Sequence, residues 1–346
     1  MARKSPCTRP FWADWPDERL LGLRLRDLGL KEPGATVRRA IDRLEADLQS
    51  RGLKLRPHFW LSDDWFCPDG VPGIAVPFYL AHPRLAALEQ RMVGTAEGAE
   101  GPECLRILRH EAGHAIENAF LLRRLPPRRD CFGPSSRRYP SAYSPRPFSR
   151  AYVRHLPGHY AQSHPDEDFA ETFAVWLQDP PTRWRKRYAG WPALRKLETM
   201  EWLMEAVRGM APLVRSTTRI GPLEESGRTL AQHYASKRKK WRLVPSAALE
   251  SCLGRVLSEL GQPNKPDASG YLRVTTAERF LRKIKADTAG SLAVRMGRRR
   301  YEVAWALESW ARHAGKSGWV IPSTAPFRDG APPPTFGRRS RKIPSA

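Results

Sequence analysis

Apolar residues recur every three or four positions along much of the chain, which is the period of an amphipathic helix. The pattern is continuous between Gly34 and Gly52, where Gly34-Ala-Thr serves as a start signal. It returns from about Cys104 to Arg123. Further helical patterns are found in residues 165–210, with breaks, and in residues 246–260 and 275–313.

Two shorter segments have the character of β-strands. Residues 53–61 alternate apolar and polar side chains, and the apolar run 73–80 follows the turn sequence Asp69-Gly-Val-Pro-Gly. Pro77 cannot donate to a strand ladder, so the second segment is expected at a sheet edge. Such an edge could bind an extended peptide as an added strand, although a plain edge strand explains the pattern equally well.

Loops divide the chain into parts. Residues 126–165 contain eight prolines and six tyrosines or phenylalanines, and such a long irregular segment usually has a function or wraps over a cleft. The proline- and arginine-rich end of the chain is typical of a flexible tail. We predict an N-terminal α+β part, a proline-rich and helical part, a basic helical extension and a tail, at residues 11–125, 126–210, 211–320 and 321–346.

Composition narrows the class of protein. The 346 residues include 12 Trp, 12 Phe and 9 Tyr, enough for a substantial core. The longest apolar stretch, about nine residues at 73–81, is too short to span a bilayer, and no apolar signal segment follows the N-terminus. The five cysteines are scattered and form no Cys-x-x-Cys pair, which favours a reducing compartment. We therefore expect a cytoplasmic protein.

The net charge of +23 is concentrated towards the C-terminus. Residues 211–346 contain 26 lysines and arginines and 10 acidic residues, a net charge of +16. A basic surface attracts polyanions, and a weak polyanion contact through this part is one interpretation. A solvated arginine-rich surface is the simpler one, because no nucleic-acid-binding signature accompanies the charge.

The segment from His110 to His114 is an HExxH motif within a predicted helix. At 100° per residue the two histidines lie about 40° apart, so both can bind one cation. Glu111 lies beside them, where it could polarise a water molecule on the metal. The apolar residues of the helix occupy the opposite arc, which argues against histidines that merely fill the core. The motif also arises by chance, so it needs a third ligand to support it.

A catalytic zinc site has three protein ligands and an open position. The metzincin continuation HExxHxxGxxH is excluded, because Glu117 and Phe120 stand where its glycine and histidine would be. The sequence has neither the EGCLS motif of peptide deformylases nor a second ExxH for a di-iron bundle. The remaining possibility for the third ligand is a glutamate from another helix, as in the gluzincins.

Candidates for that glutamate lie in the acidic segment at His164–Glu171. Pro165 and the acidic residues suit a first helical turn. Glu167 and Glu171 share one face beside small residues that allow close helix packing, and buried carboxylates there need a cation or hydrogen-bond donors. We predict Glu167 as the metal ligand and Asp168, about 100° round the helix, as solvent-facing. The alternative is an ordinary acidic helix N-terminus.

The stretch ILRHEAGHA, followed by HYAQSHPDEDFAETFAVWL, resembles the zinc-binding metallopeptidases of bacteria, a gluzincin-like group. The upstream segment RPHFWLSDDWFCPDGVPGIAVPFYLAHPRL is similar to the same family, so the resemblance covers roughly residues 11–210. It implies a zincin-like α+β core and one Zn²⁺ per chain, held by His110, His114 and Glu167. It also implies that Glu111 is the general base.

Tyr160 precedes Glu167 by seven residues, and a more distant gluzincin has a tyrosine at the same spacing from its ligand glutamate. A phenol stays protonated at neutral pH and can donate to a developing oxyanion. Pro165 interrupts a regular helix, so the chain can turn Tyr160 back over the metal. Packing against the proline-rich segment is the alternative role for Tyr160. The alternative donors are His155, His159 and His164.

These features predict a zinc-dependent hydrolase, foremost a metallopeptidase acting on a peptide or protein, with Glu111 and Tyr160 as catalytic residues. Glu171 is expected beside the metal ligands without binding the metal. Hydrolysis of a non-peptide amide is an alternative, because the same groups would serve it. A polyanion- or nucleic-acid-binding protein with a structural metal site is another, but such sites have four ligands, usually with cysteine.

Overall fold

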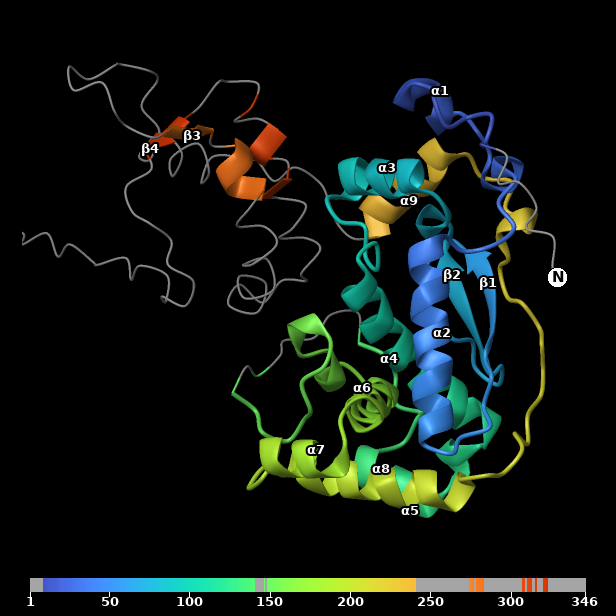
Figure 1. Ribbon diagram of the computed structural model, residues 1–346, viewed down its shortest axis with the longest axis vertical. Helices are drawn as coiled ribbons and strands as arrows, with labels where there is room; N and C mark the ends of the chain where they lie inside the picture. Colours follow the sequence, from blue (N-terminus) through green and yellow to red (C-terminus); the bar gives the residue numbers. More distant parts are fainter. Residues whose placement is uncertain are drawn as a thin grey trace, which may run out of the picture.

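Two helices from distant parts of the chain, α4 (Gly101–Ala119) and α6 (Pro165–Gln178), pack against each other at the centre of the protein (Figure 1). Helix α2 (Ala35–Ser50) packs along α4, and α8 (Ala193–Val207) packs against α6. The computed structural model describes residues 9–140, 146 and 148–240, and the short pieces 274–276, 278–282, 307–308, 310–312, 315 and 320–322.

The helix predicted between Gly34 and Gly52 is confirmed as α2. It buries the apolar face that its sequence pattern indicated, including Val37, Leu44 and Leu48. Gly34 precedes the first helical residue with an extended backbone, as a start signal should.

Small residues bring α4 and α6 unusually close together. A Cβ atom placed on Gly113 would lie 2.7 Å from the Cα atom of Ala170 and 3.0 Å from its carbonyl oxygen. Only glycine fits at this crossing. The prediction that small residues of the acidic helix allow close packing is confirmed at Ala170.

Helix α4 ends earlier than its sequence pattern predicts. The expected end was Arg123, but the helix stops at Ala119 and Leu121 takes a left-handed conformation with φ of 54°. The carbonyl oxygen of Ala119 accepts hydrogen bonds from the N–H groups of Leu213 and Val214, at 2.9 and 3.0 Å. The N–H groups of a distant segment thus bond to the carbonyl oxygen that would accept a helical hydrogen bond if α4 continued.

Strands β1 (His58–Ser62) and β2 (Gly73–Pro77) form a parallel pair, and β2 packs against α4 (Figure 1). Both strands are shorter than predicted. After Pro77 the chain enters the 3₁₀ helix η2 (Phe78–Ala81), so proline does mark the end of pairing. Phe78 and Tyr79 are buried in the core.

Strand β2 lies at the edge of its two-stranded sheet, as expected for residues 73–80, but this edge is covered rather than open. Every residue of β2 is buried. Its side facing away from β1 meets the connecting segment, because the N–H of Ala75 donates to the carbonyl oxygen of Phe66 at 2.8 Å. The link between the two strands folds back and covers the edge that proline was expected to protect.

The stretch 126–165 is less irregular than predicted. It contains helix α5 (Pro126–Phe132) and the 3₁₀ helix η4 (Pro157–Gln162). Two prolines open α5, where the missing N–H groups need no helical partner. Downstream, α7 (Pro181–Arg187) and α8 confirm the broken helical pattern predicted up to residue 210.

Helices α3 (Pro83–Val93) and α9 (Leu230–Lys240) were also not predicted, and they pack against each other. Lys237 pairs with the buried carboxylate of Glu89 at 2.7 Å across this contact. The start of the predicted basic extension therefore packs on the N-terminal part, and the division of the chain into four parts stays a prediction.

Most of the expected C-terminal structure lies outside the described residues, including the helix at 246–260 and nearly all of the tail. Where residues 275–313 were expected to be helical, strand β3 (Val274–Thr276) pairs antiparallel with β4 (Val320–Pro322). Residues 278–282 are helical. The mixture of helices and small sheets agrees with an α+β fold. In the part of the chain that is described, no helix combines the length and apolar character needed to cross a bilayer.

Candidate metal centre

Three side chains from α4 and α6 converge at the crossing of these helices. His110 and His114 stand one turn apart on α4, and Glu167 lies in the first turn of α6. The Oε2 atom of Glu167 lies 3.0 Å from Nε2 of His110 and 3.3 Å from Nε2 of His114. The two histidine Nε2 atoms are 3.2 Å apart. Among the described residues, these three side chains are the group that could hold a metal ion.

The triangle has the size that zinc requires. Zinc binds imidazole nitrogen and carboxylate oxygen at about 2.0–2.2 Å, so ligand atoms at tetrahedral angles lie about 3.3 Å apart. The observed edges of 3.0 to 3.3 Å match this value. Two imidazoles and one carboxylate are also a donor set that zinc favours. The residues fit a zinc ion.

The electrostatics of the cluster suit a cation as well. Burial lowers the pKa of His110, but Glu167 and Glu171 raise it by more, so the net shift is well upward. Burial lowers the pKa of His114, and Glu167 outweighs this effect too. Burial raises the pKa of Glu167, yet the two histidines bring it well below its ordinary value. The Glu167 carboxylate is therefore ionised, and its negative charge stabilises a positive charge between it and the histidines.

Glu171 lies behind His110. Its Oε1 atom is 2.9 Å from Nδ1 of His110, and its Oε2 atom accepts a hydrogen bond from the N–H of Leu156 at 2.8 Å. Donation from Nδ1 to this carboxylate leaves the Nε2 lone pair directed at the metal position. Glu171 thus lies where the sequence analysis expected it, beside a ligand and outside the ligand triangle.

Glu111 lies next to the ligands and is 7% exposed. Its carboxylate makes no hydrogen bond with any residue that the structure describes. Burial raises its pKa, while the neighbouring His110 and His114 oppose this shift. A buried carboxylate without a hydrogen-bond donor is a stronger base than an exposed one.

The prediction that Asp168 faces solvent is wrong. The residue is 3% exposed, and its carboxylate pairs with Nζ of Lys196, on α8, at 2.5 Å. Burial raises the pKa of Asp168 to about 7, against the opposing effect of Lys196. The helical wheel placed Asp168 away from Glu167 correctly, but it could not show that α8 covers that side of α6.

Tyr160 lies beside the first ligand. Its ring centroid is 5.5 Å from that of His110, with the ring planes at 50°. The chain reverses just before it, because Gly158 and His159 both have positive φ values, of 79° and 55°. The expected turn towards the metal position is present, and the catalytic role of Tyr160 stays a prediction.

Two of the alternative donors are engaged by backbone groups. His155 Nε2 lies 2.9 Å from the carbonyl oxygen of Arg106. His164 Nε2 lies 2.6 Å from the carbonyl oxygen of Arg137, while its Nδ1 accepts from the N–H of Asp166 at 3.2 Å. His159 is half-buried.

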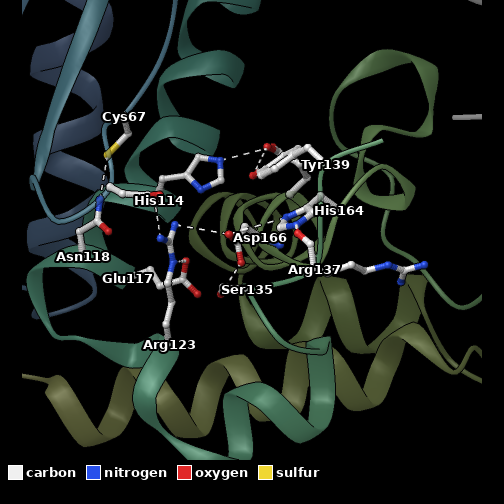
Figure 2. A network of polar contacts seen from close by, with 12 residues as sticks. Cys67, His114, Glu117, Asn118, Arg123, Ser135, Arg137, Tyr139, His164 and Asp166 are labelled. Atoms are coloured by element: carbon white, nitrogen blue, oxygen red, sulfur yellow. Dashed lines mark hydrogen bonds and ion pairs between the residues drawn. The ribbon is translucent and has the colours of Figure 1, made fainter. Parts of the chain in front are cut away.

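Sequence reasoning missed Tyr139. Its hydroxyl donates to Oε1 of Glu167 at 3.1 Å, and its ring stacks on His164 with centroids 3.6 Å apart (Figure 2). The only available signal was that the proline-rich segment was expected to wrap over a cleft. Tyr139 precedes Glu167 by 28 residues, and no spacing rule connects positions so far apart.

Buried ion pairs also hold the two helices together. Arg128, fully buried on α5, donates to Glu117 of α4 at 2.6 Å and to Asp166 of α6 at 2.5 Å. Arg123 adds a bond to Glu117 at 2.7 Å, and Figure 2 shows Arg123 between Glu117 and Asp166. Charged groups that are fully paired in this way are costly to break.

The chain matches a known family over this region. Residues 104–182, which carry every residue of the centre described above, match the family model described as "Putative zinc-binding metallo-peptidase". The resemblance in the sequence is confirmed for this segment. Neither the curated proteins nor the solved structures gave a match.

Proposed function

We propose that this protein is a zinc-dependent hydrolase that cleaves peptide bonds, with a gluzincin-like centre in a zincin-like core. The observation that carries the proposal is the triangle of His110, His114 and Glu167 beside the buried carboxylate of Glu111, to which no described residue donates a hydrogen bond. The family match supports zinc as the metal and peptidase as the class.

The three proposed ligands would leave one position on the zinc open for water or substrate. Zinc held by His110, His114 and Glu167 would supply a Lewis acid that makes water acidic near neutral pH and polarises a carbonyl group. A structural zinc site has four protein ligands, whereas three converge here among the described residues. This count favours hydrolysis over a purely structural metal site. It does not separate a peptide from another amide.

Glu111 is the general base in this proposal. Its carboxylate is free to accept the proton of the attacking water and to pass it to the leaving amine. His110 and His114 flank Glu111 in the sequence, so the base and the ligands share one rigid helix. Its burial excludes competing water from the carboxylate.

Tyr160 is the proposed donor to the oxyanion. Hydrolysis places negative charge on the former carbonyl oxygen, and a hydrogen-bond donor aimed at that charge stabilises it by a few kcal/mol. Tyr160 lies beside the His110 ring, and the 155–160 segment is fixed to α6 through the Leu156–Glu171 bond. The segment can thus hold a phenol near the metal position.

An extended substrate cannot pair with β2 at Ala75, because Phe66 occupies that edge. We place the substrate instead along the outer side of residues 64–67. Asn118 of α4 donates to Sγ of Cys67 at 3.5 Å and to the carbonyl oxygen of Pro68 at 2.9 Å, so this segment packs on the helix that carries the proposed base. Backbone pairing there would bind peptides with little sequence preference.

A metal analysis combined with a peptide-library cleavage assay tests the proposal. The purified full chain should contain close to one zinc per chain and cleave peptides in a chelator-sensitive way. His110→Ala and Glu167→Ala should lose the metal, whereas the matched control Asp168→Asn, on the same helix turn, should keep it. Zinc retained in Glu167→Ala, or a folded wild-type chain without affinity for zinc, would refute the assignment.

A further inference from the structure

The segment 135–139, which we call the strap, runs over the beginning of α6. Three of its residues, at alternate positions, are each bonded to a different residue of the helix start. The pairs are Ser135 Oγ with Asp166 Oδ1 at 2.6 Å, the Arg137 carbonyl with His164 Nε2 at 2.6 Å, and the Tyr139 hydroxyl with Glu167 Oε1 at 3.1 Å. The strap thus contacts the helix turn that presents the third metal ligand.

The two oxygens of Glu167 have different partners. Oε2 faces both histidines, at 3.0 and 3.3 Å, and is the atom in the ligand triangle. Oε1 accepts the hydroxyl of Tyr139. A carboxylate whose second oxygen accepts a hydrogen bond binds a metal through one oxygen more readily than through two.

We propose that Tyr139 is a positioning residue that keeps Glu167 a one-oxygen ligand. This inference rests on the proposed zinc site. By holding Oε1, the phenol turns Oε2 towards the histidines and leaves the remaining metal positions to water and substrate. A phenol is protonated at neutral pH and can therefore donate this hydrogen bond.

The stack on His164 explains how an exposed tyrosine can hold the Glu167 carboxylate in one orientation. Tyr139 is 51% exposed, whereas Glu167 is 6% exposed, so burial alone does not fix the phenol. The Tyr139 ring lies flat on the His164 ring, at an interplanar angle of 13° (Figure 2). His164 is itself buried and held at both nitrogens, by the Arg137 carbonyl and the Asp166 N–H.

These bonds also define the state of His164. Nδ1 accepts from a backbone N–H and therefore carries no proton, while Nε2 donates to a carbonyl and therefore carries one. His164 is thus a neutral imidazole whose orientation is determined by the backbone. It forms a rigid surface that directs the phenol to Oε1.

The test compares zinc affinity in Tyr139→Phe and in wild type, using the full chain and a competing chelating dye. Phenylalanine keeps the stack and removes only the hydroxyl. Losing a hydrogen bond to a metal ligand typically weakens metal binding by 10–100-fold, and we expect a loss in this range. The matched control is Tyr152→Phe, a tyrosine of the same proline-rich segment that contacts Lys196 through its ring and lies outside the centre. It should bind zinc like wild type.

Cobalt(II) gives a second readout that a general loss of stability would not move. With Oε1 released, Glu167 can bind through both oxygens, so the coordination number should rise and the visible absorption of the cobalt-loaded protein should weaken. Thermal unfolding of the metal-free variants should be unchanged, since Tyr139 is exposed and its stack is kept.

Equal zinc affinity and equal cobalt spectra in Tyr139→Phe and wild type would overturn the role of Tyr139 while leaving the zinc site intact. A weaker affinity with an unchanged cobalt spectrum would also overturn it, because the ligand mode would be the same. If wild type itself bound neither metal, the failure would belong to the proposed function.

Discussion

Gly113 is the position where packing and metal binding are most tightly joined. In Gly113→Ala the new Cβ would lie 2.7 Å from the Cα of Ala170, whereas ordinary contacts of this kind begin near 3.4 Å. The obstacle is backbone, which cannot rotate away. Helices α4 and α6 must therefore separate by about 0.7 Å, the difference between these two distances.

The magnitude follows from two opposing effects. Overpacking of a rigid core costs about 3 kcal/mol at the upper end of its usual range. Replacing a helical glycine by alanine returns about 1 kcal/mol. The free energy of unfolding should therefore fall by about 2 kcal/mol. The ligands lie on both helices, so the distances from the histidines to Glu167 should grow as well, and zinc affinity should fall.

Denaturant unfolding of the metal-free protein and zinc titration measure the two effects separately. The matched control is Gly101→Ala, at the start of the same helix, where the nearest atom to the new Cβ is a Thr36 methyl at 4.0 Å. It should be at least as stable as wild type and bind zinc equally well. If Gly113→Ala behaved like this control, the helices would not be in the contact described, and the reasoning would be refuted.

Four further outcomes are expected. Glu111→Gln should keep zinc and stability but lose peptide cleavage by about 10²–10⁴-fold, since an amide cannot accept the proton; substantial turnover would exclude Glu111 as the base. Tyr160→Phe should lower kcat by about 10²-fold at unchanged zinc content, and a wild-type rate, or the same loss in His159→Ala instead, would reassign the oxyanion donor. Zinc affinity should already fall as pH drops through neutral, above the ordinary histidine pKa of 6.5, because protons compete for histidines whose pKa is raised in the metal-free cluster; a zinc affinity that stays constant until the pH reaches 6.5 would contradict this charge assignment. Truncation after Lys240 should leave the zinc site intact but abolish salt-dependent binding to a polyanion such as heparin, and if the intact chain binds none at low salt, the solvated surface is the better interpretation.

Local patterns predicted the parts of the site that lie within one helix. The spacing of His110 and His114 is a property of the α-helix itself, so it needs no knowledge of the fold. The acidic helix could be assigned in the same way. Pro165 marks its first turn, and Glu167 and Glu171 lie on one face of it. Both helices appear in the structure with these residues on the expected faces.

Contacts between distant segments explain what the sequence analysis missed. The surroundings of Asp168 depend on α8, the end of α4 depends on residues 213 and 214, and the edge of β2 depends on the fold of its own connection. Tyr139 bonds to Glu167 across 28 residues of chain, with its ring stacked on His164. None of these arrangements has a period or a spacing that a single sequence reveals.

The Arg128 ion pairs have a consequence for the order in which the protein and its metal come together. Joining Glu117 to Asp166 closes a loop of nearly fifty residues, which costs about 3 kcal/mol of chain entropy or more. The ion pairs of Arg128 with Glu117 and Asp166 offset this entropy cost when the protein folds, and none of these residues is a proposed metal ligand. In small zinc domains the metal itself must organise the chain, and the apoprotein is unfolded. Here the two halves of the ligand set are already joined, so a metal ion can enter and leave a folded protein.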